Sequence, residues 1–258
     1  RLSATIVGFL VLATTVMAWR ICRNDRYITG ACTLALVMVI VAAILGGVTV
    51  LTELTLWAAL LHLGIAELVV ACMAIALVHG WNGASKRTPG QTGAHSEGWY
   101  DLLLAFIVFS TFALILSGSY MVRLGYGFSC ATWPLCRGSV FPEEAAFLLH
   151  MAHRYAAVLV GIFIVGASLK AWVQSRQNLK LFWVFSLAFG IFVVQVLIGA
   201  GMLWWGYSSL RALHLLMATL LWLSVVIVTL LHFRGKYTWV LKSSLGLDRE
   251  PGTERVGP

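Results

Sequence analysis

The sequence predicts an all-α integral membrane protein in which seven transmembrane helices are seen and eight are expected in the full protein. Of the 258 residues, 60% are hydrophobic and 11% are charged, and the mean hydropathy is +0.89. Soluble domains carry about 25% charged residues. Seven apolar runs are long enough to cross a bilayer, which takes roughly 20 residues each. An internal repeat also predicts two pseudo-symmetric four-helix halves.

The first three runs, 3–20, 31–52 and 56–79, lie in an N-terminal half-bundle, residues 1–79. In lipid, the backbone polar groups can be satisfied only within a helix or a closed barrel. None of these runs alternates with the period of two that barrel strands require, so each is predicted to be one helix. The linker that follows, 80–99, is rich in Gly, Ser, Thr and Pro, which is typical of a flexible connection.

Four further runs form the predicted C-terminal four-helix half-bundle, residues 100–232, and residues 233–258 form a tail. These runs lie at 100–122, 145–172, 182–204 and 208–232.

The net charge of +8 follows from how the basic residues are distributed along the chain. The loops alternate between rich and poor in Lys and Arg, and most of these residues fall on one side of the predicted membrane. Because the basic side faces the cytoplasm, we expect a multi-pass protein of a prokaryotic plasma membrane with a cytoplasmic C-terminus. This pattern explains the charge better than nucleic-acid binding does, so no nucleic-acid partner is expected.

Two of the five cysteines, Cys130 and Cys136, share one short loop that the charge pattern places outside the cell. A close pair in an oxidising compartment favours a disulfide. Free thiols and metal ligation remain alternatives, although no second Cys or His pair lies nearby to complete a zinc site.

The repeat relates the two halves at a nearly constant offset. Residues 1–8 resemble 154–161 at an offset of 153, and His62 and His214 are 152 positions apart in similar phrases. Arg1 therefore matches Arg154, and the counterpart of His153 would precede the first residue. We expect that one span, one outer loop and the start of the next helix are missing from the sequence. The alternative is a seven-span protein with an eroded first half.

Three histidines lie inside apolar runs, where a polar ring must be paired or ligated. His153 and His214 fall within about two turns of the outer ends of their runs. This matched depth suits axial ligation of a haem iron from opposite sides. His62 is the first-half equivalent of His214 and marks a second haem-sized site. A histidine that only bonds a backbone carbonyl remains the alternative for each ring.

Three arginines lie near these sites. Arg154 follows His153 directly, Arg1 is its counterpart in the repeat, and Arg211 precedes His214 by three residues. Each either extends its side chain to the interface or pairs with a haem propionate through its planar guanidinium. His150 is expected to support His153. Glu67, five residues beyond His62, is expected either to relay protons or to pair within the bundle.

Taken together, these phrases resemble the haem A synthase family. The resemblance rests on Cys130-Ala-Thr-Trp-Pro-Leu-Cys136, on His153-Arg154 with Ala156, Ala157 and Gly161, and on His214-Leu215 with Ala218. In the first half it rests on Gly46-Gly47 and His62-Leu63 with Ala66.

The resemblance implies a haem b in the C-terminal half, ligated by His153 and His214. It implies that the N-terminal half binds haem O as substrate, with His62 as a catalytic ligand, and that a methyl group is oxidised to a formyl to give haem A. The family also has a glutamate and a histidine just before the position of Arg1, and neither is present in this sequence. The alternative function is therefore that of a non-catalytic haem b membrane cytochrome or a respiratory-complex assembly subunit.

The same resemblance implies several partners. These are membrane lipid, haem O synthase, an electron donor and a terminal oxidase under assembly, and a homo-oligomer is compatible with the sequence.

Overall fold

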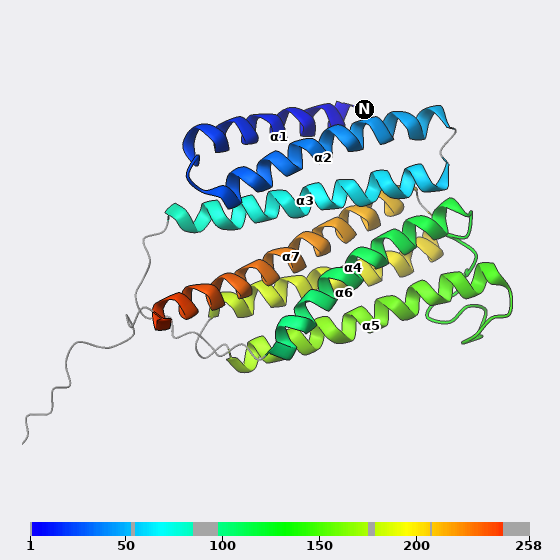
Figure 1. Ribbon diagram of the computed structural model, residues 1–258. Coiled ribbons are helices and arrows are strands. Elements are labelled where there is room, and N and C mark those ends of the chain that lie inside the picture. Colours follow the sequence, from blue (N-terminus) through cyan, green and yellow to red (C-terminus); the bar gives the residue numbers. More distant parts are fainter. Residues whose placement is uncertain (1, 53–54, 85–97, 175–178, 207, 245–258) are drawn as a thin grey trace, which may run out of the picture.

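Seven helices cross the molecule in an up-and-down order in the computed structural model (Figure 1), which describes residues 2–52, 55–84, 98–174, 179–206 and 208–244. Those residues contain no strand, and all seven helices are long and apolar enough to span a membrane. The all-α membrane fold is therefore confirmed. The helices are α1 (Leu2–Ile21), α2 (Arg26–Leu51), α3 (Leu56–Ala84), α4 (Gly98–Arg123), α5 (Ala145–Gln174), α6 (Leu179–Trp205) and α7 (Ser208–Ser244).

Several helix boundaries differ from the predicted runs, and the largest differences are at the start of α2 and at the ends of α3 and α7. Helix α2 begins at Arg26 rather than 31, because the Asp25 side chain accepts hydrogen bonds from the backbone N–H groups of Tyr27 and Ile28. Such an N-cap accepts hydrogen bonds from backbone N–H groups that have no partner within the first turn of the helix. Helix α7 continues to Ser244, well into the predicted tail, since no proline interrupts the chain before Pro251.

Helices α4 to α7 form a closed ring in which α4 packs on α5, α5 on α6, α6 on α7 and α7 on α4. Helices α5 and α7 are thus diagonal to each other. The core of the ring comes from every one of its helices and includes Leu104, Ile164, Phe185 and Leu221.

Helices α1, α2 and α3 lie side by side along one flank of that ring (Figure 1). Helix α1 packs on α2, where the Thr15 hydroxyl donates to the carbonyl of Cys32, and α2 packs extensively on α3. Helix α3 then packs against α7 and α4, so it joins the two parts of the molecule.

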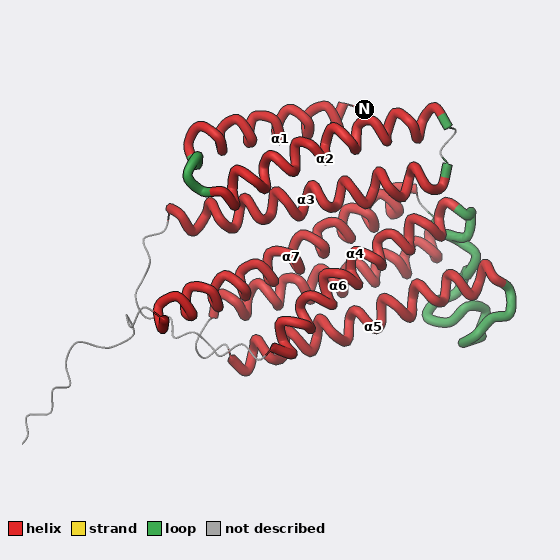
Figure 2. Tube along the Cα trace, viewed as in Figure 1, coloured by secondary structure: helices red, strands yellow, loops and turns green. Residues whose placement is uncertain are grey.

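The two ends of the bundle differ in their connections. Figure 2 shows a short turn between α1 and α2 and a long loop between α4 and α5. This loop lies at the end of the bundle opposite the α1–α2 turn. It contains Cys130 and Cys136, which form a disulfide.

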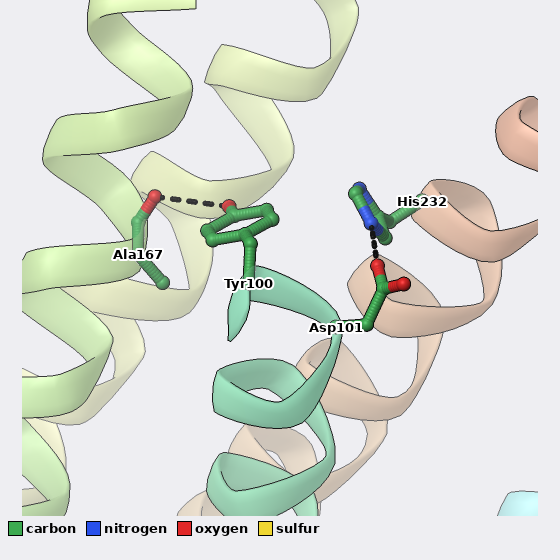
Figure 3. A network of polar contacts seen from close by, with 4 residues as sticks. All are labelled: Tyr100, Asp101, Ala167 and His232. Atoms are coloured by element: carbon green, nitrogen blue, oxygen red, sulfur yellow. Dashed lines mark hydrogen bonds and ion pairs between the residues drawn. The ribbon is translucent and has the colours of Figure 1, made fainter. Parts of the chain in front are cut away.

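A polar cluster fastens the other end of α4 to its neighbours (Figure 3). The Tyr100 hydroxyl donates to the carbonyl of Ala167 on α5, at 3.2 Å. The next residue, Asp101, pairs with Nε2 of His232 on α7, at 2.8 Å. The Lys170 ammonium lies 4.7 Å from the centre of the Tyr100 ring. We call this group the α4 clasp.

Candidate functional site

Each of the three membrane histidines packs against a glycine on the preceding helix. A Cβ atom added to Gly46, Gly118 or Gly199 would lie 3.2, 3.1 or 3.0 Å from Cε1 of His62, His153 or His214, respectively. These separations are tighter than ordinary contacts, so a larger residue at any of the three glycines would displace the ring. The α2–α3, α4–α5 and α6–α7 pairs thus share one local arrangement, which supports the repeat.

The tautomer of His62 is set by a backbone carbonyl. Its Nδ1 lies 2.7 Å from the carbonyl oxygen of Ala42 on α2. Because a carbonyl only accepts hydrogen bonds, Nδ1 carries the proton and Nε2 keeps its lone pair. This is the arrangement that a metal-ligating histidine needs.

His153 reaches the same state through a serine. Its Nδ1 lies 2.9 Å from Oγ of Ser117 on α4, and that hydroxyl donates its own proton to the carbonyl of Leu114. The serine oxygen is therefore the acceptor, and Nε2 of His153 keeps its lone pair.

The His214 ring has a hydrogen-bond partner at one of its two nitrogens. Its Nε2 lies 3.2 Å from the side-chain nitrogen of Gln195 on α6, and its Nδ1 is a buried polar atom with no partner among the described residues. Gln195 occupies the repeat position of Ala42, at an offset of 153.

His153 and His214 come from helices α5 and α7, which are diagonal to each other in the ring of α4 to α7. Two neutral imidazoles approaching from opposite sides of a four-helix ring are the donor set of a bis-histidine haem. The residues present fit that group, because each ring lies against a glycine and each can present Nε2, His153 directly and His214 once the Gln195 amide moves aside. Among the described residues no cluster of three or more His, Cys, Asp or Glu could hold a bare metal ion.

The disulfide loop is fastened to α5 beside these rings. The Arg154 guanidinium donates to the carbonyls of Pro134 and Cys130, at 2.8 and 3.4 Å. His150 is buried and interacts with Ser129 and with the backbone N–H of Cys130. In this structure Arg154 thus anchors the loop.

The other two arginines of the predicted site are placed differently. The guanidinium of Arg211 lies 5.5 Å from the centre of the Phe128 ring, so it too faces the disulfide loop. Arg1 lies outside the described residues.

Several contacts at the site could not be predicted from the sequence around each residue. Ser117 and Gln195 are single polar residues in apolar runs, and only the packing of helices distant in sequence brings them to the histidines. Gly199 aligns with Gly46 in the repeat, at an offset of 153, whereas the repeat gives Gly118 no counterpart among residues 1–258. His232, which is outside the predicted site, pairs with Asp101.

The architecture defines a multi-pass membrane bundle built from a repeat, with paired histidines in its C-terminal half. Residues 101–253 match the COX15-CtaA family, described as cytochrome oxidase assembly protein. The chain belongs to this family, and it is a multi-pass membrane protein.

Similar proteins come from several bacteria. A heme A synthase of Exiguobacterium sibiricum is 30% identical over 135 residues, 51% of this chain and 46% of that protein. A heme A synthase of Geobacillus kaustophilus is 32% identical over 141 residues, 52% of this chain and 44% of that protein. The chain therefore spans about half the length of these curated relatives.

A different kind of relative also matches. A protoheme IX farnesyltransferase of Halobacterium salinarum is 32% identical over 99 residues, 38% of this chain and 21% of that protein.

Proposed function

We propose that this protein takes part in haem A synthesis for cytochrome oxidase assembly, as an oxidoreductase that converts haem O to haem A. Membership of the family and the similarity to heme A synthases support the general role. The arrangement of His153 and His214 on diagonal helices is the single observation that carries the proposal for this chain.

In this proposal His153 and His214 hold a haem b through their Nε2 atoms. The haem would supply a reversible one-electron carrier. Ser117 fixes the His153 ring through Nδ1, and such outer contacts typically change metal affinity by about 10–100-fold. Gly118 and Gly199 allow both rings to lie close to the neighbouring helices.

His62 is proposed to bind the iron of the substrate haem in the N-terminal half. The Ala42 carbonyl holds its Nδ1–H, so Nε2 is available. The substrate methyl group that becomes a formyl would lie in this half, and a haem b held by His153 and His214 would supply one-electron transfer. An electron donor, haem O synthase and a terminal oxidase are the proposed partners. Residues 1–79 and 100–232 are the proposed substrate and haem b halves.

Haem analysis of purified variants tests this function. His153→Ala and His214→Ala should each lose the low-spin haem spectrum, because one axial ligand is removed. His79→Ala is the matched control: that ring stacks on Tyr27, away from the glycine-packed histidines, so the spectrum should remain. Full retention of low-spin haem in both ligand variants would refute the site.

Extraction and chromatography of the bound haems test the reaction. Haem B together with haem O or haem A in the wild-type protein supports the synthase. Haem B alone, with no haem A formed in a host that supplies haem O, would instead indicate a non-catalytic cytochrome.

A further inference from the structure

Glu67 is the one acidic side chain that the structure buries among the residues it describes, with 2% of its surface exposed. It lies in the middle of α3. Its Oε1 accepts a hydrogen bond from the Thr219 hydroxyl of α7, at 2.6 Å, and its Oε2 has no partner among the described residues. A carboxyl group in this setting is costly, and its presence points to a function.

Thr219 is the counterpart of Glu67 in the repeat. The two residues are 152 positions apart, the same separation as His62 and His214. A residue that contacts its own equivalent lies on the symmetry axis, so the pseudo-twofold axis passes between these side chains. The Trp222 indole also donates to the Glu67 carbonyl, at 2.9 Å, across the same interface.

Glu67 and Thr219 have the same position relative to the histidines of their own halves, His62 and His214. Each follows its histidine by five positions, about 7.5 Å along the helix axis and about 140° around it. Glu67 therefore leaves α3 on a different face from His62, and Thr219 leaves α7 on a different face from His214. The side-chain hydrogen bond of Glu67 goes to Thr219 and not to a histidine.

The packing of α3 on α7 does not by itself require an acid. A threonine at position 67 could donate to or accept from Thr219 and would carry no charge to bury. No charged side chain interacts with the Glu67 carboxyl in the part of the chain that the structure describes. The titratable or charged groups on the helices packed against α3, with side chains described, are Arg26, Tyr27, Cys32, Tyr100, Asp101, Tyr120, Arg123, Arg211, His214, His232 and Arg234. Most of these groups lie near the helix ends. His214 is a proposed ligand of the C-terminal haem, so we take the charge of that haem as the nearby charge that can change.

We propose that Glu67 is a proton-exchange site on the pseudo-twofold axis, which binds a proton when the C-terminal haem is reduced and releases it when that haem is oxidised. This inference rests on the proposed function, because it requires a haem at His153 and His214. For each event a haem held by His153 and His214 would take up one electron from an external one-electron reductant, and one proton from the solvent would convert the Glu67 carboxylate to the acid. Reduction removes one positive charge, which favours the neutral acid, and charges interact strongly in the low-dielectric core.

Redox-difference infrared spectroscopy of the haem-loaded protein tests this assignment, together with potentiometric titration at several pH values. The wild-type protein should show a carboxylic-acid carbonyl band that appears on reduction, and its haem midpoint potential should fall as pH rises. Glu67→Gln and Glu67→Thr keep an interhelical hydrogen-bonding group without an exchangeable proton. Both should lose the band, and their midpoint potentials should become independent of pH over the range in which the wild-type value changes.

Thr219→Val is the matched structural control. It removes the same hydrogen bond but keeps the acid, so the band should shift and persist. If the wild-type protein shows no such band, or if Glu67→Gln keeps the wild-type pH dependence, Glu67 is only a structural residue and the inference is wrong. Absence of haem from the wild-type protein would instead refute the proposed function, and the inference with it, so the two failures are distinguishable.

Discussion

At the scale of single residues, the site depends on small side chains as much as on the histidines. Each ring lies against a glycine, and two of the three rings have their Nδ1 atom held by an identified acceptor. These contacts fix ring orientation and leave Nε2 accessible, which is the geometry an axial ligand needs. His214 is the exception, because Gln195 lies beside its Nε2.

Gly199→Ala should weaken haem binding. The added Cβ would lie 3.0 Å from Cε1 of His214, and overpacking typically costs about 1–3 kcal/mol. Haem affinity should fall by roughly five- to 100-fold, as measured by titrating haem into haem-depleted protein.

Gly190→Ala provides the control for this change. Gly190 lies on the same helix, and an added Cβ would meet no atom within 4 Å. Alanine has a higher helix propensity than glycine by about 1 kcal/mol, so this variant should not destabilise the helix. Because the added Cβ touches no neighbour, haem affinity should stay at the wild-type value. Equal affinities for Gly199→Ala and the wild type would show that the His214 ring can move away without loss.

At the scale of secondary-structure elements, α4 depends on polar contacts at both of its ends. At one end the α4 clasp ties it to α5 and α7 through Tyr100 and Asp101. At the other end it leads into the disulfide loop, which Arg154 holds against α5. Ser117 lies between these ends, so the clasp and the loop together set its position relative to His153.

Asp101→Ala should destabilise the bundle without changing its haem. It removes the 2.8 Å contact with His232 and leaves a partly buried partner unpaired, at a cost of about 1–3 kcal/mol. The midpoint temperature of unfolding in detergent should fall, and the haem spectrum should stay the same.

Two further variants separate this bond from other effects. Asp101→Asn keeps an acceptor for the His232 N–H and should recover part of the lost stability. In a His232→Phe background, Asp101→Ala should cost less than it does in the wild-type protein, because the contact with His232 is already absent. A full, additive loss in the double variant would mean that Asp101 acts through a different neighbour.

At the scale of the whole molecule, the α1–α2 turn and the disulfide loop lie at opposite ends of the helices (Figure 1). The α1–α2 turn contains Arg23, and the loop between α4 and α5 contains Glu143. The positive-inside rule predicts that the end with the α1–α2 turn faces the cytoplasm.

Labelling of single-cysteine reporters in intact cells tests this orientation. In a variant with Cys22, Cys32 and Cys72 replaced by alanine, Glu143→Cys should react with a membrane-impermeant maleimide. Arg23→Cys should react only after the cells are permeabilised. Both side chains are exposed, so labelling in the reverse order would mean that the topology is inverted.

The sequence by itself determined the features that depend on local composition. Apolar run lengths predicted all seven spans, because a helix is the one open structure that satisfies its backbone in lipid. The repeat and the position of each histidine in its span predicted which rings bind haem, and this stays a prediction. The pairing of Cys130 with Cys136 could be anticipated because they share one short loop.

Only the tertiary structure decided which side chains contact each other between helices. Membrane helices are apolar on most faces, so their patterns do not indicate which face packs on which neighbour. The contacts of His153 with Ser117 and of His214 with Gln195 therefore could not be read from spacing. The pairing of Glu67 with Thr219 likewise depends on how α3 packs against α7, because that packing brings two equivalent positions of the repeat to a common axis.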